Sequence, residues 1–159
     1  MMDNVNVIRN GFIAPDFSLP STDGRIVSLK DCLLDDFLAL CFFSGWDDSR
    51  IRTFLSDLNG ELPKSASGYG FKVVGISPEK IHHLTRLKNE LGLDFPLLSD
   101  ERMVVSRRYY IVNHERPGHA VHFSIFIIDE ELIVRHRVSE AYNKKFQIED
   151  FKKEISAII

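Results

Sequence analysis

Residues 37–50 read FLALCFFSGWDDSR, and this stretch decides the fold. Its first half is apolar throughout, which is typical of a short strand that is covered on both faces of a sheet. Asp47, Asp48 and Ser49 can then cap a helix, because apolar residues continue behind them at helical spacing. The stretch therefore predicts a buried strand that leads directly into a helix over about residues 49–58.

The alternation of strand and helix continues along the chain. Residues 71–77 form a second apolar run, and Ser77 is expected to cap a helix that begins at Pro78 and ends at Gly92. Ser99 is expected to start a further helix. The remaining predicted elements are strands at 123–128 and 132–138 and an amphipathic helix over 146–159.

A small hairpin is expected before the first core strand, because residues 17–19 and 26–29 flank an Asp-Gly turn. A parallel crossover that is followed by an antiparallel hairpin and a packing helix produces a mixed sheet. The order of elements therefore predicts an α/β fold with a mixed central β-sheet flanked by helices and an N-terminal β-hairpin.

Length and charge narrow the class of protein. A chain of 159 residues is expected to form one domain, 1–159, and a formal net charge of -3 with interspersed signs argues against nucleic acid as a partner. The first ten residues lack the basic and apolar runs of a signal peptide, so a cytoplasmic location is predicted. No membrane span is expected, since the longest apolar run falls well short of about 20 residues.

Four segments, in order, resemble the alkyl hydroperoxide reductase and thiol-specific antioxidant family, the peroxiredoxins of the thioredoxin-like superfamily. They are GFIAPDFSLP at 11–20, VVGISP at 73–78, FPLLSD at 95–100 and FIID at 126–129. The resemblance covers nearly the whole chain and implies a thioredoxin-like fold of the peroxiredoxin type.

The catalytic segment departs from that family. The family carries a peroxidatic cysteine, or a Cys-x-x-Cys pair, at the start of the helix after the first core strand. Asp47 and Arg50 stand where the pair would fall, and no cysteine follows Cys41. Phe123 stands where the family places an arginine or a cis-proline. The resemblance therefore implies a scaffold that has lost its thiolate-activating site, since a helix start and a nearby arginine activate such a thiol.

Only two thiols can replace that nucleophile. Cys41 lies inside the most apolar run of the chain, where core packing is favoured over a displaced nucleophile. Cys32 follows Lys30 and Asp31, so we expect it to be more exposed and able to form a disulfide with a partner. The neighbouring carboxylate would raise the pKa of Cys32, which favours a surface thiol without a special role.

The former active-site turn, Trp46 to Arg50, is the candidate binding site. Asp47 and Asp48 are interpreted as helix caps rather than catalytic carboxylates. Trp46 and Arg50 are residue types enriched in binding hot spots, whereas inherited packing explains Trp46 equally well. Both interpretations of Trp46 stay open at this point.

Three histidines, His114, His119 and His122, are grouped closely enough to suggest a zinc or copper site. Their irregular spacing and the absence of a neighbouring cysteine disfavour it, so no cofactor is expected. His82 and His83 are expected to point to different sides of their helix, which argues against a shared metal.

Two functions follow from these observations. The preferred one is a non-catalytic protein that binds a protein or small-molecule ligand near the Trp46 turn, because the expected thiol is absent. The alternative is a thiol-dependent peroxidase or disulfide oxidoreductase that uses Cys32 or Cys41. A homodimer is compatible with the apolar tail at Ile155, Ile158 and Ile159.

Overall fold

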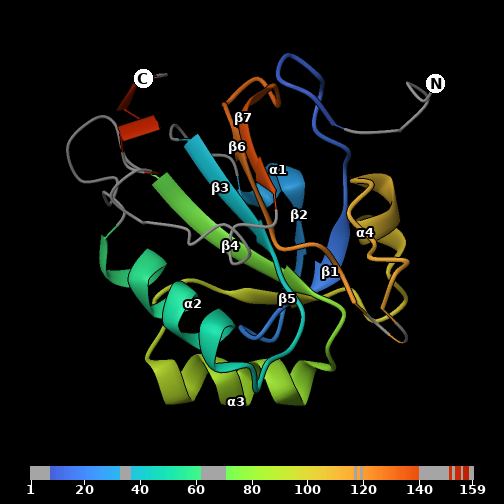
Figure 1. Cartoon of the computed structure of the whole chain (residues 1–159), viewed down its shortest axis with the longest axis vertical. Coiled ribbons are helices and arrows are strands. Elements are labelled where there is room, and N and C mark those ends of the chain that lie inside the picture. Colours follow the sequence, from blue (N-terminus) through green and yellow to red (C-terminus); the bar gives the residue numbers. More distant parts are fainter. Residues whose placement is uncertain are drawn as a thin grey trace.

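A five-stranded mixed sheet forms the centre of the computed structural model (Figure 1). The structure describes residues 8–32, 37–61, 71–116, 118, 120–139, 151, 153–154 and 156–157. The strands are β3 (Phe37–Phe42), β4 (Phe71–Ser77), β5 (Leu97–Ser99), β6 (Ser124–Ile128) and β7 (Val134–Ser139), and their order across the sheet is β5-β4-β3-β6-β7. β3, β4 and β5 are parallel, whereas β6 and β7 run antiparallel to their neighbours. The predicted mixed sheet is confirmed.

The central strand β3 is covered on both faces, as its apolar sequence predicts. Leu38, Leu40 and Phe42 contribute to one buried cluster, and Ala39 and Cys41 contribute to the other. All five side chains are fully buried. Successive residues of a strand point to opposite faces, so one apolar run supplies the centre of both cores.

The helices divide between the two faces of the sheet. The helices α2 (Ser49–Glu61) and α3 (Ile81–Leu91) lie on the same face (Figure 1). The short helix α4 (Val104–Arg108) and the hairpin of β1 (Ser18–Pro20) and β2 (Ile26–Ser28) cover the other face. Leu19 of β1 pairs with Val27 of β2, which confirms the hairpin around the Asp-Gly turn. One helical turn, α1 (Leu29–Cys32), follows the hairpin and was not predicted.

Two predicted helix starts are wrong. α3 begins at Ile81 rather than Pro78, because the fully buried hydroxyl of Ser77 accepts a hydrogen bond from the Glu79 N–H (3.4 Å) before the helix starts. α4 begins at Val104 rather than Ser99, because residues 97–99 extend the sheet as β5. In both cases the first residues of the predicted helix belong to another element, a turn in the first case and a strand of the sheet in the second.

The C-terminal helix is seen only in part. Phe151, Lys153, Glu154 and Ser156 are helical, and Phe151 is buried in the same cluster as α2 and α3. The rest of the helix predicted over 146–159 lies outside the described residues, apart from a turn at Ala157.

Candidate functional site

The candidate site is the turn that joins the carboxyl end of β3 to the start of α2. Gly45 in this turn has a φ of 87°, a conformation that favours glycine, and the Asp48 N–H donates to the Gly45 carbonyl (2.9 Å). Since β3 and β4 are parallel, the turn lies at the same edge of the sheet as the start of α3. Residues 44–50 therefore meet the first turns of α3.

Asp48 is the N-cap of α2. Its Oδ1 accepts the Arg50 backbone N–H at 2.8 Å, and its Oδ2 lies 3.1 Å from Nη2 of the Arg50 side chain. Hydrogen bonding from the Arg50 guanidinium, supported by the backbone N–H groups of Arg50 and Ile51, lowers the pKa of Asp48. The cap interpretation is confirmed for Asp48. Asp47, the other predicted cap, is exposed beside it.

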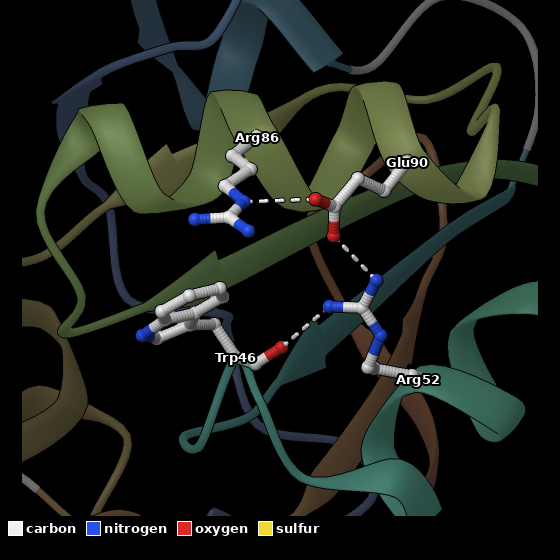
Figure 2. A network of polar contacts seen from close by, with 4 residues as sticks. All are labelled: Trp46, Arg52, Arg86 and Glu90. Atoms are coloured by element: carbon white, nitrogen blue, oxygen red, sulfur yellow. Dashed lines mark hydrogen bonds and ion pairs between the residues drawn. The ribbon is translucent and has the colours of Figure 1, made fainter.

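Trp46 packs against α3 while its side chain stays partly exposed. Its ring stacks on His83 with centroids 4.8 Å apart and planes 13° apart, and the guanidinium of Arg86 lies 5.5 Å from the ring centroid. The Trp46 carbonyl accepts a hydrogen bond from Arg52 at 3.2 Å (Figure 2). Packing therefore accounts for the position of the ring and leaves part of its surface available.

The rest of the turn is open to solvent. Ser49 is exposed, and the Arg50 side chain is 59% exposed even though it pairs with Asp48. The turn thus presents an aromatic ring, a guanidinium, a hydroxyl and two carboxylates on one short segment. These groups can bind a ligand through stacking and hydrogen bonds, and none of them is a sulfur nucleophile.

Cys32 is buried, so the prediction that it is more exposed is wrong. The turn of α1 brings the side chain into the core cluster below the hairpin, where it is 2% exposed, and its Sγ donates to the Ser28 carbonyl at 3.3 Å. The pKa of Cys32 is raised to about 11, mainly by burial; the charge of Lys72 partly opposes this shift and the charge of Asp31 adds to it. Lys30 and Asp31, which precede Cys32 in the sequence, are exposed to solvent, whereas the Cys32 thiol points into the core.

Cys41 is a core residue, as its apolar sequence context predicts. Its side chain is fully buried in the cluster below α2 and α3. Burial raises the pKa of Cys41 strongly. A thiol in this environment is neutral and shielded, which is the opposite of what a nucleophile requires.

We expect both native thiols to resist alkylation. A shift of the Cys32 pKa from 9.0 to about 11 lowers its thiolate fraction at neutral pH about hundredfold, and Cys41 is still less ionised. Iodoacetamide at pH 7, followed by mass spectrometry, should leave the folded protein unlabelled and label both cysteines in urea. Labelling of Cys32 in the folded protein at the rate seen in urea would contradict this expectation.

Phe123 packs into the core instead of supplying charge to the site. It is 1% exposed and meets Phe54 of α2 edge-to-face, with ring centroids 4.5 Å apart. None of the described residues follows a cis peptide bond. The position that the resemblance equates with an activating arginine or a cis-proline is therefore apolar, and Phe123 supports α2 from below.

The candidate histidine site, which the sequence disfavoured, gains no support. His114 is exposed, the backbone N–H of His122 donates to the Ile111 carbonyl (2.7 Å), and His119 lies outside the described residues. The described part of the chain contains no group of three or more metal-ligating side chains. His82 and His83 have ring centroids 4.2 Å apart, so the prediction that they point to different sides is wrong. The His83 ring also stacks on the ring of Trp46.

Two further features were missed by sequence reasoning. One is a pocket of about 540 Å³ between β1, the start of α3 and the segment around α4, with Leu19, Ile81, Val104, Arg102 and Arg108 in its lining. The other is a bridge of ion pairs from Arg52 through Glu90 to Arg86. The pocket is lined by segments that are remote in sequence, so no local sequence pattern indicates it. The i,i+4 spacing of Arg86 and Glu90, by contrast, is a weak sequence signal for their ion pair.

No helix in the described ranges combines the length and apolar character needed to cross a membrane.

Comparison with known proteins gives consistent results. A family model described as the AhpC/TSA family matches residues 11–137. Peroxiredoxin Bcp of Escherichia coli K12 is 31% identical over 140 residues, which cover 83% of this chain and 86% of that protein. The family model spans the hairpin, the Trp46 turn and the five strands of the sheet except the last two residues of β7.

Solved structures agree on the fold. Peroxidoxin BcpB of Mycobacterium tuberculosis superposes with a TM-score of 0.73 at 21% identity, covering 87% of this chain and 94% of that one. A peroxiredoxin-like protein from Aquifex aeolicus has a TM-score of 0.82 at 15% identity, covering 97% and 90%. The α/β architecture described above is thus the thioredoxin-like fold of peroxiredoxins.

Proposed function

The chain belongs to the AhpC/TSA family of peroxiredoxins, and from that premise we propose that it binds a protein or small-molecule ligand at the Trp46–Arg50 turn without thiol chemistry. One observation carries the proposal. The start of α2, where the family resemblance expects a nucleophilic cysteine, holds the Asp48 cap and its Arg50 partner. Both cysteines of the chain are buried elsewhere with raised pKa values.

The turn has the composition of a binding surface. Trp46 offers a ring face at low entropy cost, and Arg50 offers a guanidinium that is 59% exposed. Asp47 and Ser49 add exposed polar groups beside them. A homodimer and a cytoplasmic location both stay predictions.

The comparisons favour a second candidate, a thiol-dependent peroxidase or disulfide oxidoreductase. The relatives are named peroxiredoxins, and on these names alone the thiol peroxidase is better supported than the binding role. Cys32 is its better nucleophile, because it lies near the surface turn of α1, whereas Cys41 is fully enclosed in the central strand. This candidate requires Cys32 to leave its core position before it reacts.

Peroxide consumption separates the two candidates. With a dithiol reductant and either hydrogen peroxide or an organic hydroperoxide, we expect no consumption above buffer for the wild-type protein. Matched variants are Cys32→Ser, whose hydroxyl can still donate to the Ser28 carbonyl, and Cys41→Ala, which avoids an unpaired buried hydroxyl.

Peroxide consumption that is lost in one of these variants would establish a relocated nucleophile and replace the binding proposal. If consumption stays at the buffer level, ligands can be screened by the emission of Trp46, because it is the one tryptophan of the chain.

A further inference from the structure

Glu90, near the end of α3, links two arginines with its two carboxylate oxygens (Figure 2). Oε1 accepts from Nη2 of Arg52 at 2.6 Å, and Oε2 accepts from Nε of Arg86 at 2.8 Å. Arg86 belongs to the same helix, whereas Arg52 lies in the first turn of α2. The carboxylate therefore ties the start of α2 to α3.

Each of these arginines also contacts Trp46, and they do so from different sides of the residue. Arg52 donates through Nη1 to the Trp46 carbonyl at 3.2 Å, so it holds the backbone. Arg86 places its guanidinium 5.5 Å from the ring centroid, and His83 stacks on the ring one helical turn earlier. Backbone and ring are thus held by groups that meet at one carboxylate (Figure 2).

Removing the carboxylate would affect both arginines at once. The Arg52 side chain is 26% exposed, so its guanidinium would lose an ionic partner in a partly desolvated position. Arg86 is 65% exposed and would be free to take other rotamers. The flexible side chains that hold Trp46 would then lose the acceptor that fixes their geometry.

We propose that Glu90 is a positioning residue for the Trp46 turn, holding Arg52 and Arg86 so that the tryptophan presents one fixed surface to a ligand. As a role in ligand binding this rests on the proposed function, but the pose of Trp46 exists without any ligand. Glu90 itself need not touch the ligand. It acts across the gap between α2 and α3 through its two partners.

The pose can be tested on the free protein with the Glu90→Gln variant. We expect the near-ultraviolet circular dichroism of Trp46 to weaken and the rate at which acrylamide quenches its fluorescence to rise about twofold. Because exposed ion pairs contribute little to global stability, we expect Tm to fall by about 4 °C or less. The control is Asp57→Asn, which removes an exposed carboxylate from α2. It should leave the circular dichroism and the quenching rate of Trp46 unchanged.

A double-mutant comparison tests whether Glu90 acts through its partners. Arg52→Met keeps the aliphatic stem but removes the donor to Trp46. Glu90→Gln should therefore raise the quenching rate less in the Arg52→Met variant than in the wild-type protein. Unchanged Trp46 signals in Glu90→Gln, or a fully additive effect with Arg52→Met, would overturn the inference. If the signals change as expected and no ligand binds the turn, the binding role fails while the positioning role stands.

Discussion

A cysteine introduced at Asp48 is expected to have a pKa of about 7.5 or lower and to be alkylated at pH 7 roughly 50-fold faster than the native thiols. The substitution replaces a carboxylate that accepts the Arg50 backbone N–H at 2.8 Å and faces the Arg50 guanidinium. A thiolate in that position meets the same donors and the positive end of α2. Helix starts of this kind lower a thiol pKa to about 3.5–7.5.

The size of this effect follows from ionisation. A thiol with a pKa of about 7.5 is roughly one quarter thiolate at pH 7, whereas the raised pKa of Cys32, about 11, leaves about one part in ten thousand. The more acidic thiolate is a weaker nucleophile, which offsets about 40-fold of that difference. The burial of Cys32 and Cys41 adds to the remaining advantage of the new thiol.

The control for Asp48→Cys is Ser56→Cys, which places a thiol on the exposed middle of the same helix. The pH dependence of iodoacetamide labelling gives the pKa of each new cysteine. We expect the midpoint for Asp48→Cys to lie at least about one pH unit below that for Ser56→Cys. Equal midpoints would mean that the start of α2 does not provide an environment that favours a thiolate.

This test asks whether the start of α2 offers the setting that the resemblance expects around a reactive thiol. If the introduced thiol ionises easily, the start of α2 provides an electrostatic setting that favours a thiolate, even though Asp47 and Arg50 stand where the resemblance places the cysteines. Phe123 packs against Phe54 in the core, so the position that the resemblance equates with an arginine or a cis-proline is apolar here. The positions that the resemblance singles out therefore lie on separate segments, one at the start of α2 and the other directly before β6.

The parts of the fold that follow from local sequence were predictable. The run from Phe37 to Phe43 has no polar alternation, and it forms a strand buried on both faces. Asp-Gly between apolar runs correctly indicates the hairpin. The cap function of Asp48 was also predictable, because a carboxylate before an apolar helical pattern has a local partner in the backbone two residues later.

The predictions that were wrong depended on contacts between residues remote in sequence or on the direction of a single side chain. Cys32 follows two charged residues, yet one helical turn directs its thiol to Ser28 and the core. Residues 97–99 became a strand because β4 lies beside them, which the local pattern could not indicate. Arg52 and Glu90 are separated by 38 positions and meet only because the sheet brings α2 and α3 together.

Replacing Phe42 with alanine is expected to lower the free energy of unfolding by about 3–5 kcal/mol. Phe42 is fully buried at the end of β3, and its ring lies 4.9 Å from Tyr109 and 5.8 Å from Phe126 between centroids. Tyr109 in turn donates to the Pro15 carbonyl at 2.6 Å, so a cavity here also loosens the N-terminal segment. Urea denaturation followed by far-ultraviolet circular dichroism measures the loss.

Phe12→Ala is the matched control for this prediction, because the same atoms are removed from a side chain that is 47% exposed. We expect that control to change the free energy of unfolding by about 0.5 kcal/mol or less. If Phe42→Ala does not fold, Phe42→Leu, which leaves a smaller cavity, should lose about 1–2 kcal/mol and supply the comparison. Equal losses of unfolding free energy for Phe42→Ala and Phe12→Ala would contradict this prediction. They would mean that burying the Phe42 ring against Tyr109 and Phe126 does not stabilise the hairpin face of the sheet.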